Sequence, residues 1–259
     1  MVIKPLLTFS PLEEGILLKR YKRFLADVEL KDGEIVTAHC ANTGPMTGVL
    51  HQGGRVRLRY APSPTRKLDW SWEQAEVLDE IGKSCWVGIN TSIPNKLVRL
   101  AIEADFLEDY IGKFEEIRPE VPYGLNKRSR IDLWIKPAEQ SSDSRPIFLE
   151  VKNTTWKQGN VALFPDTVTE RGQKHLKELI NVLPEARSIL VPCLSRSDVE
   201  TFAPGDSADP IYGKLFRDSL VAGVEIIPCC FGFHRDKITW EGTRMVNEKL
   251  LKEIHDLRR

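Results

Sequence analysis

The first part of the chain is a series of short β-rich runs in which apolar residues are interspersed with polar ones. These runs cover residues 6–9, 15–30, 34–39, 55–61 and 70–72. Turn-forming residues separate them at 32–33, 42–44, 52–54 and 62–64. Many short strands with frequent turns predict a small β-barrel or sandwich. The one helix expected in this part is a short helix near residues 73–82.

After residues 85–88 the pattern changes to alternating helices and strands. Ser92-Ile93-Pro94 is a typical helix start, and apolar residues at helical spacing follow it to residue 106. Strands are predicted at 114–117, 130–136, 146–152, 188–192, 224–230 and 237–240, and helices at 166–183, 208–222 and about 243–257. This order predicts a mixed sheet flanked by helices. We therefore expect an α+β chain, with a barrel over residues 1–84 and an α/β domain over 85–259.

Composition places the chain among globular proteins. Its 259 residues are 41% hydrophobic and 29% charged, which is enough to build a core. No apolar run approaches the roughly 18–20 residues that span a bilayer, and the N-terminal residues lack the apolar core of a signal peptide. Five scattered cysteines without a Cys-x-x-Cys pair argue against a disulfide framework or a structural zinc site. We expect a cytoplasmic protein with no membrane partner.

The net charge of zero hides a basic N-terminal region. Through residue 67 there are 11 Lys or Arg and 6 Asp or Glu residues, a local balance of +5. Basic and aromatic residues on a small barrel could form a nucleic-acid groove, in which cations contact phosphates and rings contact bases. The alternative is an ordinary solvated sheet face, on which Arg55, Arg57 and Arg59 alternate along one strand. The candidate nucleic-acid-binding residues are Lys19, Arg20, Lys22, Arg23, Arg55, Arg57, Arg66 and Lys67.

The clearest chemical signal lies on two neighbouring predicted strands. Asp132 is on the first, and Glu150 and Lys152 are two residues apart on the second, so these two side chains project to the same face. If the strands pair as a hairpin, Asp132 comes close to Glu150, and two such carboxylates raise each other's pKa unless a cation balances them. Oxygen ligands in small number suit Mg²⁺, or Mn²⁺ in its place. The pattern predicts a phosphodiester-hydrolysis site in which Asp132 and Glu150 hold the metal and Lys152 assists; the alternative is a structural ion-pair group.

Two weaker signals accompany this site. On the helix predicted at 166–183, Thr169 and Gln173 share one flank and could bind phosphate or position water; the alternative, which the pattern favours, is a plain surface helix face. The polar turn at residues 41–46 could contact a ligand, or could be only a turn. The five histidines show no metal-ligand spacing.

Taken together, these segments resemble the sugar fermentation stimulation protein family (SfsA). The resemblance is carried by residues 20–24, 38–44, 66–73, 86–91, 94–95, 123–124, 129–132, 150–153 and 164–179. It implies an N-terminal OB-like barrel, a C-terminal domain like the PD-(D/E)XK nucleases, DNA binding and a role in regulating sugar (maltose) metabolism genes. The nuclease-like motif corresponds to Asp132, Glu150 and Lys152, and Gln173 stands where some members of that superfamily carry a glutamine. Ala41 and Pro45 depart from the family pattern, which weakens a ligand role for that turn.

Three hypotheses follow. The chain is a DNA-binding protein, with RNA as an alternative ligand, that regulates transcription. Or it is a Mg²⁺- or Mn²⁺-dependent nuclease that uses Asp132, Glu150, Lys152 and Gln173. Or it is a small-molecule or protein-interaction module with a decayed nuclease fold, in which Asp132, Glu150 and Lys152 pair with one another. The sequence leaves the oligomeric state open.

Overall fold

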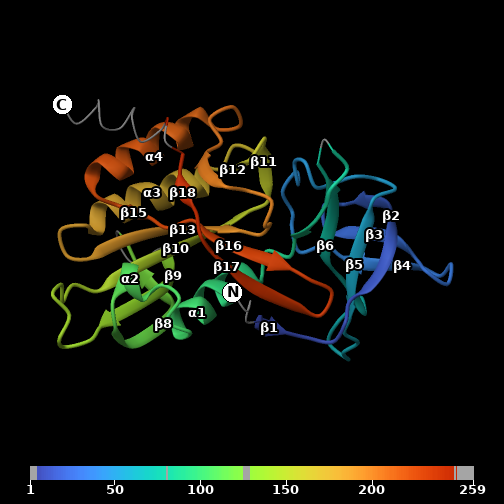
Figure 1. The fold of residues 1–259 in the computed structure, drawn as a ribbon, viewed down its shortest axis with the longest axis horizontal. Coiled ribbons are helices and arrows are strands. Elements are labelled where there is room, and N and C mark those ends of the chain that lie inside the picture. The colour runs from blue at the N-terminus through green and yellow to red at the C-terminus, as the bar shows by residue number, and fades with distance from the viewer. Residues whose placement is uncertain (1–4, 80, 125–128, 248, 250–259) are drawn as a thin grey trace.

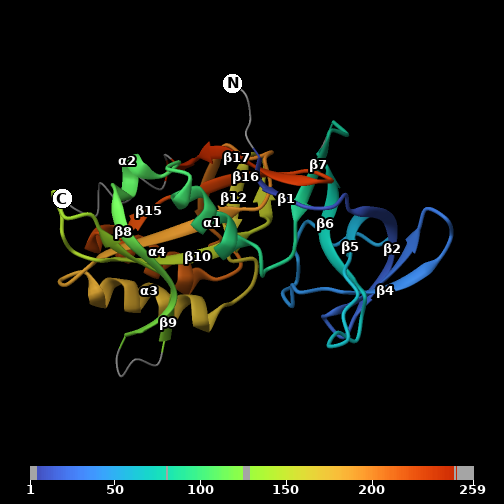
Figure 2. The ribbon, with the colours of Figure 1, turned by 90° about the horizontal axis from the view of Figure 1, so that it is seen from below.

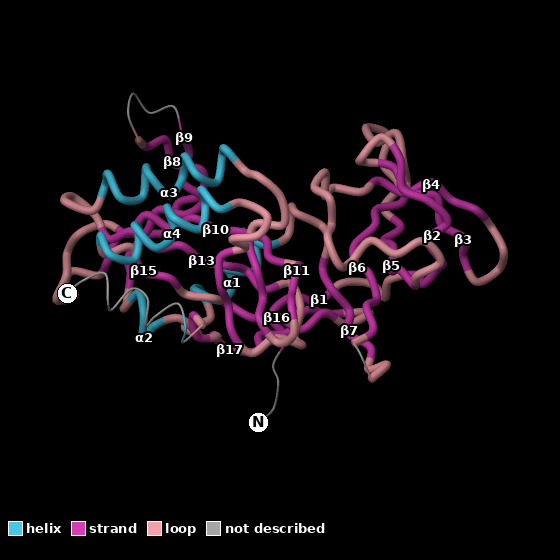
Figure 3. Tube along the Cα trace, turned by 90° about the horizontal axis from the view of Figure 1, so that it is seen from above, coloured by secondary structure: helices cyan, strands magenta, loops and turns pink. Residues whose placement is uncertain are grey.

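The computed structural model describes residues 5–79, 81–124, 129–247 and 249. They form two domains that lie side by side, an all-β domain from the N-terminal part and a larger domain with helices (Figure 1). Among the described residues the helices belong to the larger domain, as the colouring of Figure 3 makes clear. The prediction of a barrel followed by a mixed-sheet domain is confirmed.

The N-terminal domain is a closed barrel. Its strands are β2 (Glu13–Tyr21), β3 (Leu25–Leu30), β4 (Ile35–His39), β5 (Arg55–Tyr60), β6 (Trp70–Leu78) and β7 (Ser84–Gly88). They pair in the order β4-β3-β2-β5-β6-β7, and a parallel pairing of β4 with β6 closes the ring. On β5, Val56 and Leu58 point into the barrel while Arg55, Arg57 and Arg59, which alternate with them, face outward. The interior packs around the fully buried Trp72.

The prediction of a short helix at residues 73–82 is wrong, because residues 73–78 continue strand β6 and the chain then leads to β7. Glu73, Gln74 and Ala75 have the intrinsic preferences of helical residues. In the barrel, however, β6 pairs with β5 on one side and β7 on the other, and residues 72–75 are all buried. Tertiary pairing therefore overrides local preference.

The larger domain is built on an eight-stranded mixed sheet. Its strands are β1 (Pro5–Thr8), β8 (Phe114–Tyr123), β9 (Ser129–Pro137), β10 (Ile147–Thr154), β13 (Arg187–Leu194), β15 (Glu225–Ile226), β16 (Cys229–Phe233) and β17 (Lys237–Thr243). Their order is β1-β17-β16-β13-β10-β9-β8, with β15 beside β13. A second sheet contains β11 (Trp156–Gln158), β12 (Val161–Phe164), β14 (Thr201–Pro204) and β18 (Met245–Val246).

Helices cover both faces of the large sheet (Figure 2). They are α1 (Pro94–Glu103), α2 (Glu108–Ile111), α3 (Glu170–Val182) and α4 (Pro210–Ala222). The pair α3 and α4 lies on one face, and α1 and α2 lie on the other. Each helix buries its apolar stripe; α1, for example, places Leu97, Val98 and Ala101 against β10 and β13. Strand β10 thus runs through the middle of the domain, between two helical layers.

Three expectations near the chain ends need correction. Strand β1, which we expected in the barrel, pairs with β17 at the edge of the large sheet. The strand expected over 224–230 is divided into β15 and β16, with Pro228 between them, because proline cannot donate a ladder hydrogen bond. Of the closing helix expected over 243–257, residues 245–246 form β18 instead, and residues 250–259 lie outside the described residues.

The two domains are joined by hydrogen bonds and by a close approach of the backbone. The Gly88 amide donates to the Ser195 carbonyl at 2.8 Å, and Gln74 Nε2 donates to the His234 carbonyl at 2.8 Å. A Cβ atom at position 88 would lie 2.1 Å from the Phe233 ring, so glycine is required for this contact. These contacts hold the barrel against the larger domain.

Two further observations bear on the expectations from composition. In the described parts of the chain, no helix has the length and hydropathy needed to cross a membrane. All five cysteines are buried and free.

Candidate functional site

Strands β9 and β10 pair antiparallel, as the hairpin hypothesis requires. Their ladder runs from Ile135 opposite Ile147 to Leu133 opposite Leu149, and then ends. At the next position a side chain replaces the backbone acceptor of the ladder, because Asp132 Oδ2 accepts the Val151 backbone N–H at 2.7 Å. The end of the ladder thus places a carboxylate beside the strand that carries Glu150.

Asp132 is held from two sides. Its Oδ2 is bound by the β10 backbone, and its Oδ1 accepts a hydrogen bond from Asn95 Nδ2 on α1 at 2.7 Å. Burial and the negative charge of Glu150 raise the pKa of Asp132 to about 6. The two carboxylates are therefore close enough to repel each other, as the sequence predicts.

Glu150 is buried in the protein interior, with 2% of its surface exposed. Its Oε1 accepts hydrogen bonds from Lys152 Nζ at 2.6 Å and from His175 Nδ1, and Lys152 Nζ lies 2.9 Å from His175 Nδ1. Burial alone raises the pKa of Glu150, but the positive charge of Lys152 and the contact with His175 lower it below its ordinary value. Glu150 is therefore ionised at neutral pH.

The second oxygen of this carboxylate, Oε2, is buried and accepts no hydrogen bond from the described residues. An ionised oxygen in the interior needs a donor or a cation. Among the described residues, no group of three or more His, Cys, Asp or Glu side chains forms a metal cage. Two carboxylates with water or phosphate in the remaining positions suit Mg²⁺ or Mn²⁺, so Asp132 and Glu150 fit a hydrated divalent cation.

The arginines of β5 share one face of the strand, and each one contacts a carboxylate. Arg55 pairs with Glu14 and Glu76, and Arg57 pairs with the same Glu14. The Arg57 guanidinium also lies 3.6 Å from the centre of the Trp86 ring. This surface is therefore largely neutralised, which agrees better with a solvated sheet face than with a phosphate-binding groove.

Arg20 and Arg23 bind backbone carbonyls of a neighbouring turn. Arg20 donates to the carbonyls of Asn42 and Gly44 at 2.8 and 3.0 Å, and Arg23 donates to that of Thr43 at 2.8 Å. They hold the polar turn at residues 41–46, whose first carbonyl in turn accepts a hydrogen bond from Thr91. Directly after the turn, the Thr47 N–H donates to Asp166 Oδ2 of the larger domain at 3.1 Å, so this part of the barrel contacts the other domain.

The remaining basic candidates divide into two groups. Lys19 pairs with Asp27 at 3.2 Å, and Arg66 donates to Ser71 Oγ and to the Ala61 carbonyl. Lys22 and Lys67 are exposed and form no ion pair or hydrogen bond with any other described residue. Of the eight predicted cations, these two have side chains without any partner among the described residues, whereas Arg20, Arg23 and Arg66 donate to neutral oxygens.

Comparison with protein families accounts for both domains. Residues 18–89 match the family model "SfsA N-terminal OB domain", and residues 92–237 match "Sugar fermentation stimulation protein RE domain". The chain belongs to the SfsA family. A sugar fermentation stimulation protein homolog from Prochlorococcus marinus (strain MIT 9303) is 74% identical over 240 residues, which cover 93% of each chain. One from Synechococcus sp. (strain WH7803) is 68% identical over 240 residues, covering 93% of this chain and 94% of the relative.

A solved structure has the same fold as this SfsA-family chain. It is that of Pyrococcus furiosus SfsA in complex with Ca²⁺, with a TM-score of 0.78 and 27% sequence identity. The match covers 94% of this chain and 99% of the other. An SfsA protein with the same two-domain architecture has thus been observed with a divalent cation.

Gln173 forms its hydrogen bonds with Asp209 and not with the acidic site. Its Nε2 donates to both carboxylate oxygens of Asp209, at 3.0 Å each. Asp209 is the N-cap of α4 and also accepts the Thr169 N–H, so this contact ties the starts of α3 and α4 together. Within the described residues no hydrogen bond joins Gln173 to Asp132, Glu150 or Lys152. A catalytic role for Gln173 stays a prediction from the family resemblance.

Sequence reasoning missed His175. Histidine spacing gave no signal, because Nδ1 of this residue contacts Glu150 and Lys152 on another element, and its Nε2 accepts a hydrogen bond from Arg171 Nε at 3.4 Å. The available signal was its place on the buried face of α3, between Gly172 and Leu179. A lone polar residue on the apolar face of an amphipathic helix must find a partner across the packing interface.

We predict that Lys152→Met destabilises the metal-free protein by about 3–5 kcal/mol, because it leaves Glu150 as a buried charge with one fewer partner. The double variant Lys152→Met/Glu150→Gln should lose clearly less free energy of unfolding than the two single variants lose together. Urea unfolding in the presence of EDTA measures both.

The exposed pair Lys214 and Asp218, with Nζ 2.8 Å from Oδ2, is the matched control. In the same double-mutant cycle, the interaction energy between these two side chains should not exceed about 0.5 kcal/mol. If Lys152→Met and Lys214→Met lose the same free energy of unfolding, the buried ion pair of Glu150 and Lys152 is contradicted.

Proposed function

We propose that this chain is a nucleic-acid-binding phosphodiesterase that depends on a divalent cation, with DNA as the first candidate substrate and RNA as the second. The observation that supports it most is the buried Glu150, which has one oxygen bound by Lys152 and His175 and the other without a hydrogen-bond partner. Asp132 lies near enough for Glu150 to raise its pKa.

The cation would be held by Asp132 and Glu150, with Mg²⁺ or Mn²⁺ as the candidates. The Ca²⁺ complex of Pyrococcus furiosus SfsA supports this choice, because Ca²⁺ is also a hard cation that takes oxygen ligands. Bound there, the cation would neutralise charge on a scissile phosphate as a Lewis acid.

The protein's own groups would prepare this site. Asn95 and the Val151 N–H fix the orientation of the Asp132 carboxylate. His175 contacts Oε1 of Glu150, so that Oε2 is left for a cation. The Lys152 ammonium, 11% exposed, lies at the edge of the buried cluster, where it would stabilise negative charge at phosphorus.

The competing hypotheses differ in what they require. A decayed site predicts that Glu150 and Lys152 only pair with each other, and such a pair is present. It offers no reason to retain a second acid, Asp132, whose pKa is raised by its neighbour. A purely DNA-binding regulator likewise needs no such acid. Regulation of sugar (maltose) genes stays a prediction from the family resemblance.

We predict that the wild type cleaves at least one member of a panel of single-stranded, duplex and branched DNA and of RNA in Mg²⁺ or Mn²⁺, and that EDTA abolishes cleavage. Asp132→Asn, Glu150→Gln and Lys152→Met should each reduce the rate by about 10²–10³-fold, the cost of removing one stabilising group. Gel-resolved cleavage rates measure this.

The matched control is Glu225→Gln, which removes a carboxylate paired with Arg187 in the same large sheet. It should keep full activity. If all substrates stay intact with both metals, the chain does not have the proposed activity.

The two unpaired cations lie at one end of the barrel. The register places Leu25 opposite His39 and His39 beside Ser71, so the segments that hold Lys22 and Lys67 meet at that end. Residues 41–46 leave the barrel from the same end, and Thr47, which follows them, donates its N–H to Asp166 of the larger domain. Nucleic acid bound there would bridge both domains.

We therefore predict that Lys22→Ala/Lys67→Ala reduces the slope of log affinity against log salt by roughly 2 for duplex DNA, since each phosphate contact contributes about 0.9. Fluorescence anisotropy over a salt series measures it. Lys31→Ala, which removes a cation that lies 3.6 Å from Glu14, is the control and should leave the slope unchanged. An unchanged slope in the double variant would exclude this end of the barrel.

A further inference from the structure

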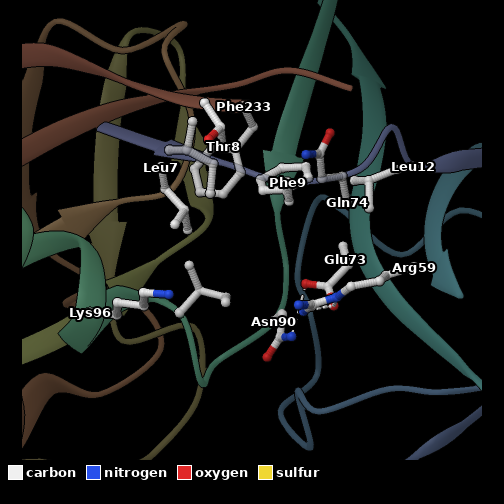
Figure 4. Close-up of a pocket in the computed structure, with 12 residues that line it drawn as sticks. Leu7, Thr8, Phe9, Leu12, Arg59, Glu73, Gln74, Asn90, Lys96 and Phe233 are labelled. Carbon is white, nitrogen blue, oxygen red and sulfur yellow. Dashed lines mark hydrogen bonds and ion pairs between the residues drawn. The ribbon is translucent and has the colours of Figure 1, made fainter. Parts of the chain in front are cut away.

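A cavity of about 210 Å³ lies between the two domains, apart from the acidic site. It is lined by β1 and the segment that follows it, by β5 and β6 of the barrel, by the start of α1, and by β16 and β17 (Figure 4). Asp132, Glu150 and Lys152 are not among its lining residues. Small-molecule sites are often found at such domain interfaces.

Most of the wall is apolar. It is formed by Leu7, Phe9, Leu12, Ile93, Phe233 and Ile238. These side chains come from the larger domain and from the β1 segment that leads into the barrel, and in Figure 4 Leu7, Phe9 and Phe233 stand along one side of the space. A ligand that fits here must carry a hydrocarbon part.

The acceptor groups in the wall already have partners. Glu73, 8% exposed, pairs with Arg59 through Oε1 and accepts from Asn90 Nδ2 at 2.9 Å through Oε2. Gln74, 1% exposed, uses both ends of its amide, since Oε1 accepts from Arg57 and Nε2 donates to a backbone carbonyl. The wall therefore has no free buried acceptor for a cationic ligand among these residues.

Two cationic donors face the space. Lys96 forms no hydrogen bond or ion pair with any described residue, and Arg59 uses Nε and Nη2 on Glu73 while Nη1 has no partner there. Figure 4 shows Lys96 extending from α1 on one side and Arg59 from the barrel on the other. Since Glu73 balances Arg59, one positive charge, that of Lys96, is left uncompensated.

We propose that this cavity binds a small organic monocarboxylate, with its hydrocarbon part on the apolar wall and its carboxylate between Lys96 and Arg59. The volume is below the range of about 300–1,000 Å³ for drug-sized ligands, so the ligand is small. A phosphate monoester fits less well, because it carries a charge of about −1.5 to −2 and would lie beside the Glu73 carboxylate.

Binding should also stabilise the contact between the domains. Both domains and β1 contribute to the wall, so a ligand that binds only the folded arrangement raises the melting temperature. This effect does not depend on nucleic acid or on a metal ion.

The test is calorimetric titration and thermal melting of the full chain with a series of probes: butanoate, hexanoate, octanoate and phenylacetate, each compared with its neutral amide. We expect at least one carboxylate to bind at one site and to raise the melting temperature. The neutral amide should bind with an affinity at least about tenfold lower, because it lacks the negative charge that Lys96 contacts.

Lys96→Gln should weaken carboxylate binding by about tenfold while leaving the fold intact, since this side chain is exposed. Lys214→Gln, which removes an exposed lysine from α4, should change nothing. The proposal is overturned if no probe binds at millimolar concentration, if each amide binds as well as its acid, or if Lys96→Gln binds like the wild type.

Discussion

The burial of one ionised carboxylate is the constraint on which the centre of the larger domain depends. A charge that is 2% exposed must be balanced, and Glu150 is balanced by Lys152 on its own strand and by His175 on α3. These contacts fix the distance between β10 and α3 at the point where the β9–β10 ladder ends. Asp132 lies at that same end, where the Val151 N–H and Asn95 hold its carboxylate beside the strand that carries Glu150.

The relation between the domains follows from how the barrel uses its cations. Arg20 and Arg23 stabilise the turn at 41–46 instead of facing a ligand, and Thr47, directly after that turn, contacts the larger domain. Gly88 allows the backbone to approach Phe233, and Gln74 reaches the His234 carbonyl. A basic sequence segment thus supports an interface, and Lys22 and Lys67 are the two of the predicted cations whose side chains have no partner among the described residues.

Much of the fold and part of the site could be predicted from the sequence. Period-two patterns such as Arg55 to Arg59 predict the barrel, and the spacing of Glu150 and Lys152 predicts their shared face. What failed depends on partners far away in the chain. Glu73 to Ala75 prefer helix but lie between two strands, and β1 pairs with β17 in the large sheet instead of joining the barrel. His175 was missed because its partner is on another element, a relation that no local pattern contains.

The central claim is that Asp132 and Glu150 together bind one divalent cation. Calorimetric titration of Mn²⁺ into metal-free protein at neutral pH tests it most directly. The account predicts one site that is lost in both Asp132→Asn and Glu150→Gln and is kept in Glu225→Gln. No binding to the wild type, or equal binding to all four proteins, would contradict it.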